Sequence, residues 1–113
     1  MAFSSASVSS IERVGNQNFQ GLYTDIWKVT LSVNPASIAA GASDADVFTV
    51  PGIDFGDHII SYGNGNSWGV QAMINFYIGN PGVLRMVIEN VHASSALDIG
   101  AQTVTVLIGR PAW

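Results

Sequence analysis

The stretch Tyr23-Thr24-Asp25-Ile26-Trp27-Lys28-Val29-Thr30-Leu31-Ser32-Val33 decides the fold class. Its odd-numbered positions carry Tyr, Trp, Val, Leu and Val, with Asp25 as the one polar exception, and its even-numbered positions are mostly polar. Successive side chains of a β-strand point to opposite faces, so this period of two predicts a long strand with one buried face. We therefore expect Trp27, Val29 and Leu31 to lie in a hydrophobic core. Proline cannot donate to a sheet ladder, so Asn34-Pro35 is expected to end the strand.

Shorter stretches with the same alternation follow, separated by turns rich in Gly, Pro and Asn. The predicted strands cover 46–50, 58–62, 70–78, 83–90 and 103–108, and 37–43 is expected to form a short edge segment and a turn. Short strands at this spacing predict an all-β, antiparallel β-sandwich or jelly-roll-like single domain over residues 22–113. A small closed barrel is the alternative, because periodicity does not separate the two. Further expected core residues are Ile74, Phe76, Met86, Ile88, Val104 and Val106.

The first 21 residues differ from the rest because they are rich in Ser, Asn, Gln and Gly. Only residues 8–14 could form a strand. We therefore interpret residues 1–21 as an N-terminal arm or edge extension of the domain.

Charge is scarce in this chain. Charged residues make up 11% of its 113 residues, against about 25% in typical soluble domains, while 48% are hydrophobic. One interpretation is a monomer covered by Ser, Thr, Asn and Gly. The other, which we favour, is a surface buried against other subunits, because interface cores are depleted in charge and enriched in aromatic residues. On this interpretation Phe3, Trp68 and Trp113 are expected at interfaces.

Several function classes are disfavoured by the same composition. The four basic residues are scattered singly and the net charge is −4, so we expect neither nucleic acid nor an anionic membrane as a partner. The first residues lack a basic region followed by an apolar run, which predicts no signal peptide. No apolar run approaches the roughly 20 residues that span a bilayer. We therefore expect a soluble protein made in a cytoplasm, and with no cysteine in the chain we expect no disulfides.

Candidate catalytic and metal-binding residues are few. Asp57 and His58 could form a dyad, but no serine lies in a nucleophile elbow, and the spacing of His58 and His92 is not that of metal ligands. We expect no enzyme activity and no cofactor, with Asp57 capping a turn and His58 opening a strand.

Four aspartates, Asp44, Asp46, Asp54 and Asp57, lie close enough in sequence to line a calcium site, but their spacing is not that of an EF-hand. Turn and edge roles are the favoured interpretation. In such roles Asp44 and Asp46 would be inward- or edge-pointing charges that block unwanted strand addition.

The middle of the chain resembles small virion structural proteins of tailed bacteriophages and cyanophages. The resemblance rests on Ser37-Ile38-Ala39-Ala40-Gly41-Ala42-Ser43, Phe48-Thr49-Val50-Pro51-Gly52, Gly56-Asp57, and the strands at 70–78, 84–90 and 103–108. It covers about residues 29–110, and residues 1–28 do not match the pattern. The resemblance implies a capsid decoration, or cement, protein that forms homotrimers and binds the major capsid protein on the virion surface.

Two functions remain open at this point. The first is the capsid decoration protein. The second is a carbohydrate- or receptor-binding β-sandwich of a head or tail fibre, in which Trp68 and the loop 63–67 would hold a sugar ring.

Overall fold

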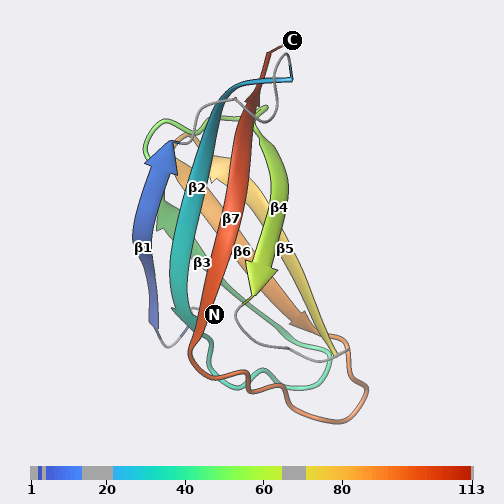
Figure 1. Cartoon of the computed structure of the whole chain (residues 1–113). Helices are drawn as coiled ribbons and strands as arrows, with labels where there is room; N and C mark the ends of the chain where they lie inside the picture. Colours follow the sequence, from blue (N-terminus) through green and yellow to red (C-terminus); the bar gives the residue numbers. More distant parts are fainter. Residues whose placement is uncertain (1–2, 4, 14–21, 65–70, 113) are drawn as a thin grey trace.

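The structure is a computed structural model that describes residues 3, 5–13, 22–64 and 71–112. These residues form two antiparallel sheets packed face to face (Figure 1). No helix of the described residues is long and apolar enough to cross a membrane. The seven strands are β1 (Ser5–Arg13), β2 (Tyr23–Asn34), β3 (Ser43–Thr49), β4 (His58–Asn64), β5 (Ala72–Asn80), β6 (Val83–Asn90) and β7 (Gln102–Pro111).

The strand order has the nested pairing of a jelly roll. The four-stranded sheet runs β1-β2-β7-β4 and the three-stranded sheet runs β3-β6-β5. The first half of the chain thus pairs with the second half in reverse order, β2 with β7 and β3 with β6. The sheets remain separate, which confirms the sandwich and jelly-roll prediction over the closed barrel.

The core lies between the sheets and is built by the alternation seen in the sequence. Trp27, Val29, Leu31 and Val33 project inward from β2 and are at most 2% exposed. Of the other expected core residues, Ile74 is half-buried at the margin of the core. The remaining ones are buried: Phe76, Met86, Ile88, Val104 and Val106.

The N-terminal segment corrects one expectation, about Phe3. Residues 5–13 form β1, which pairs along its length with β2, so this part of the chain takes the edge-extension option that the sequence left open. Phe3, expected at an interface, is 6% exposed and belongs to the core of its own chain. The reason is that pairing with β2 places Ala6 and Val8 over the core, and the preceding Phe3 is buried there with them.

Buried Asn90 links the loops at one end of the sandwich. Its side-chain amide donates hydrogen bonds to the carbonyls of Ile38 (3.0 Å) and Ser95 (2.8 Å), and its Oδ1 accepts one from the backbone N–H of His92 (3.1 Å). Ile38 in turn exchanges backbone hydrogen bonds with Leu97. A fully buried amide is stable only with such partners, so Asn90 holds the loops on both sides of the core in place.

The opposite end is closed around Trp27. The guanidinium groups of Arg13 and Arg110 lie 4.9 Å and 5.2 Å from the centre of its ring. Arg110 also forms a two-pronged ion pair with Asp57 and donates to the carbonyl of Gly52 at 2.8 Å. Hydrogen bonding to the Asp57 carboxylate raises the pKa of Arg110 above its ordinary value, so this cation stays charged. Arg13 forms a second ion pair, with Asp25.

Candidate functional site

The outer face of the three-stranded sheet is largely apolar, and we call it the apolar face. It is formed by side chains that point away from the core on β3, β6 and β5, and three of them are well exposed: Val47 by 51%, Met73 by 60% and Tyr77 by 41%. Its apolar members are Ala45, Val47, Met73, Tyr77 and Val87, and Arg85, Asn75, Ser43 and Glu89 lie on the same face.

The sheet register places these residues in rows across the strands. Val47 on β3 lies opposite Arg85 on β6, and Arg85 lies opposite Tyr77 on β5. The next row holds Ala45, Val87 and Asn75 in the same order. Directly opposed side chains in a sheet have Cβ atoms about 4.5–5.5 Å apart, so the rows form one continuous patch.

Arg85 lies at the centre of the apolar face. Its Nε is buried and donates no hydrogen bond to any residue that the structure describes. Arg and Tyr are among the residue types that contribute most to binding energy in protein interfaces. This surface therefore combines exposed apolar side chains with residue types that protein interfaces favour.

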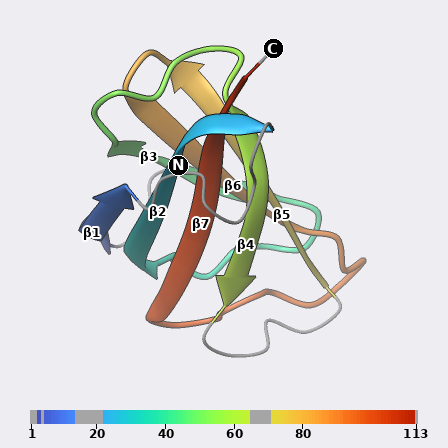
Figure 2. The ribbon, with the colours of Figure 1, turned by 45° about the horizontal axis from the view of Figure 1, so that its top comes forward.

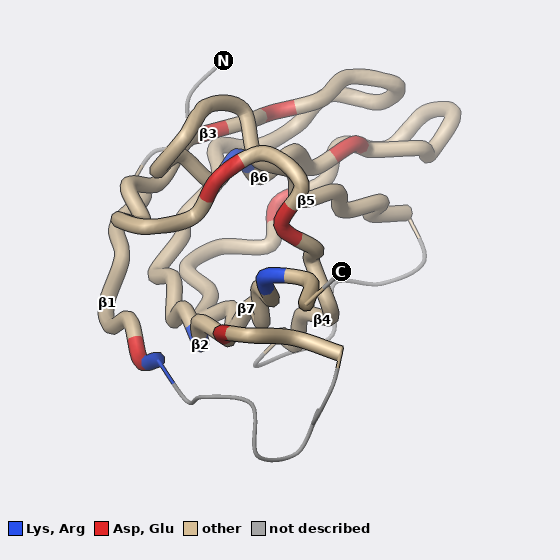
Figure 3. Tube along the Cα trace, turned by 90° about the horizontal axis from the view of Figure 1, so that it is seen from above, with Lys and Arg blue, Asp and Glu red and all other residues tan. Residues whose placement is uncertain are grey.

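The outer face of the four-stranded sheet has a different character across its middle. There the register aligns Ser10, Thr30 and Thr105 in one row, and Ser32 with Thr103 in the next. We call this region the hydroxyl face. Figure 3 shows how few charged residues the described chain carries, with an acidic and a basic residue side by side at the end of β1.

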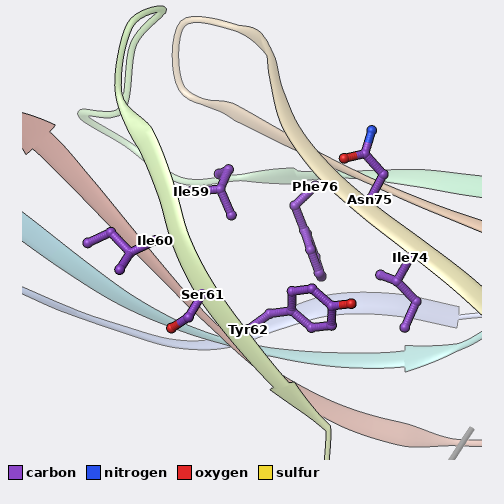
Figure 4. Close-up of a pocket in the computed structure, with 7 residues that line it drawn as sticks. All are labelled: Ile59, Ile60, Ser61, Tyr62, Ile74, Asn75 and Phe76. Atoms are coloured by element: carbon purple, nitrogen blue, oxygen red, sulfur yellow. The ribbon is translucent and has the colours of Figure 1, made fainter.

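A pocket of about 530 Å³ opens between the edge strands β4 and β5. The rings of Tyr62 on β4 and Phe76 on β5 pack against each other at its margin, with ring centres 5.2 Å apart (Figure 4). Ile59 and Ile74 also line it. Its lining is mostly apolar and holds no charged side chain, so it can take an apolar segment but offers nothing to bind an ion.

The aspartates and histidines considered from sequence lie in separate places. Asp57 accepts hydrogen bonds from Arg110 and from the backbone N–H of Asp54, while His58 packs against the ring of Tyr23. Within the described residues, no group of three or more His, Asp or Glu side chains lies close enough to hold a metal ion.

Asp44 and Asp46 take the inward-pointing option that the sequence left open. They lie on the core side of the edge strand β3, opposite Ile88 and Met86, and Asp44 is 1% exposed. Two of the expected interface residues, Trp68 and Trp113, and the loop positions 65–67 lie outside the described residues.

The apolar face was not identified from the sequence. Its outward positions on 70–78 and 83–90 could be read from the alternation, but they gave no sign of which sheet they shared. Comparison with known proteins adds no relative: no protein-family model matches the chain, and no curated protein or solved structure shows significant similarity to it.

Proposed function

We propose that this chain is a virion structural protein, a capsid decoration protein that binds the major capsid protein through the apolar face. The observation that carries the proposal is the exposure of Val47, Met73 and Tyr77 on the same sheet face as Arg85. Apolar side chains gathered on one exposed face are typical of a surface that contacts another molecule.

Composition supports the same function. A chain with 11% charged residues lacks the charged surface that keeps an isolated small domain soluble. Burial of the apolar face against a capsid removes that surface from water. A jelly-roll sandwich also suits the role, because capsid and lectin domains commonly use this architecture.

The test is co-sedimentation with undecorated capsids assembled from the major capsid protein of the same genome. We expect saturable binding that persists in 1 M salt, where the Debye length falls to about 3 Å and ionic contacts are screened. Val47→Lys should abolish it, because it places a charge in the apolar face. Thr103→Lys, the matched change on the hydroxyl face, should bind like the unchanged protein. No binding by the unchanged chain, or equal loss in both variants, would refute the proposal.

A further inference from the structure

The sandwich has four edge strands, and they are not equally protected. β1 and β4 end the four-stranded sheet, and β3 and β5 end the other. Figure 2 shows β1 and β3 on one side of the molecule and β4 and β5 on the other. An edge strand exposes backbone N–H and C=O groups, and proteins guard such edges with charges, prolines or bulges.

Three of the edges carry a protecting feature. β1 has a register shift between Val8 and Ser10 and the exposed charges of Glu12 and Arg13. β3 points Asp44 into the core, where one carboxylate oxygen has no partner among the described residues. A buried carboxylate of this kind costs stability, which is consistent with a charge that prevents other strands from pairing with β3. β4 has a register shift between Ile59 and Ser61.

β5 lacks such protection over most of its length. From Ala72 to Ile78 it contains no Asp, Glu, Lys, Arg or Pro, and its pairing with β6 is regular there. A shift occurs only between Ile78 and Asn80, beside the turn into β6. It is therefore the edge best able to accept another strand.

The direction of the free hydrogen-bonding groups on β5 follows from one backbone bond beside the strand. The N–H of Val91 donates to the carbonyl of Gln71 at 2.8 Å, which places residues 71 and 91 at a hydrogen-bonded position of the ladder. In an antiparallel pair, bonded and non-bonded residues alternate. The odd-numbered residues of β5 thus bond to β6, and the even-numbered residues direct their N–H and C=O groups outward. These residues are Ile74, Phe76 and Ile78.

We propose that β5 pairs antiparallel with β5 of a second copy across a two-fold axis at Phe76, joining two three-stranded sheets into one of six strands. Phe76 is the middle residue of the strand, and its N–H and C=O point outward. In this register Asn75 faces Tyr77 of the second copy, and Met73 faces Gly79.

The lack of charge on β5 favours a second copy of this chain as the strand that pairs with it. Across a two-fold axis each surface meets itself. A charged residue near the axis would therefore lie close to the same charge on the second copy, and β5 has no charged residue. Charge patterns are one means by which an interface selects a foreign partner, and β5 carries none. The pocket beside β5 adds apolar surface at the same site, since Tyr62 and Phe76 lie at its margin (Figure 4).

This contact goes beyond capsid binding and does not rest on it. It also predicts an even number of copies, in place of the trimer expected from the phage resemblance.

Light scattering provides the test. We expect a concentration-dependent mass of twice the 11.9 kDa of one chain. Asn75→Lys, at an exposed position, should weaken the dimer about tenfold or more, because it brings two lysines together near the axis. Adding Tyr77→Glu should restore pairing, since each introduced lysine would then face an introduced glutamate of the other copy. Thr103→Lys should dimerise like the unchanged chain.

Hydrogen exchange gives a second readout on the unchanged protein. Amides of Ile74, Phe76 and Ile78 should become protected as concentration rises, while those of Met73, Asn75 and Tyr77 are protected by β6 throughout. A monomer at all concentrations, a trimer, or a dimer unaffected by Asn75→Lys would overturn the pairing. Both measurements use the protein without capsids, so their outcome does not depend on the proposed function.

Discussion

The two outer faces of this sandwich come from strands with the same alternation, yet they differ in what they present. The hydroxyl face carries Ser and Thr in its central rows, whereas the apolar face exposes Val47, Met73 and Tyr77 around Arg85. Hydroxyl side chains remain hydrated at little cost, while exposed apolar side chains gain free energy when a partner covers them. On the proposed function, the hydroxyl face stays in solvent and the apolar face contacts the capsid.

The largest expected effect tests the core on which both faces depend. Trp27 is 1% exposed and is covered by Arg13 and Arg110. Trp27→Ala should lower the free energy of unfolding by about 3–5 kcal/mol, the range for truncating a large buried aromatic residue. Chemical denaturation measures the change. A loss below about 1 kcal/mol would mean that Trp27 is not packed between the sheets.

The next prediction separates binding from stability on the apolar face. Tyr77→Ala should weaken capsid binding by about 2–4 kcal/mol, as expected for an aromatic residue that a partner buries. Its exposed side chain contributes little to the fold, so thermal unfolding should change by less than about 1 kcal/mol. Titration of capsids with the variant, beside a melting curve, provides both numbers. If the loss of stability matched the loss of capsid binding, Tyr77 would not be an interface residue.

Gly109, on the four-stranded sheet, should give the reverse pattern, in which a substitution lowers stability but leaves capsid binding unchanged. A Cβ at Gly109 would lie 2.6 Å from the ring of Tyr23 and 2.8 Å from Ile60 Cδ1. Gly109→Ala should therefore destabilise the fold by about 1–3 kcal/mol through overpacking, with capsid binding unchanged. Gly63→Ala on β4 is the matched control, because a Cβ there meets nothing within 4 Å. Equal effects in the two variants would show that crowding by Tyr23 is not the cause.

The smallest effect is expected on the hydroxyl face itself. Thr103 is exposed and lies opposite Ser32. Thr103→Lys should change the free energy of unfolding by less than about 0.5 kcal/mol and should leave both dimerisation and capsid binding intact. Reduced binding by this variant would show that the two faces do not divide their roles as proposed.

The sequence alone determined the strands whose pattern repeats strictly and the class of fold that they build. The alternation from Tyr23 to Val33 predicted β2 and its buried face, and the turns around Pro81-Gly82 predicted the β5–β6 hairpin, because period and turn chemistry are local properties. The low charge also predicted a surface suited to contacts. The alternation misassigned one residue, Ile26, which is 1% exposed although it lies on the outer side of β2.

Tertiary structure decided everything that depends on which strands become neighbours. Polar residues 5–13 form a strand because β2 offers them an edge to pair with, and Phe3 is buried as a consequence. The apolar face exists only because β3, β6 and β5 share a sheet. Their register brings Val47, Arg85 and Tyr77 into one row, although Val47 and Arg85 are 38 residues apart in the sequence. The exposed edge of β5 likewise follows from its place at the end of that sheet. Pairing and register are set by long-range burial, which no local pattern encodes.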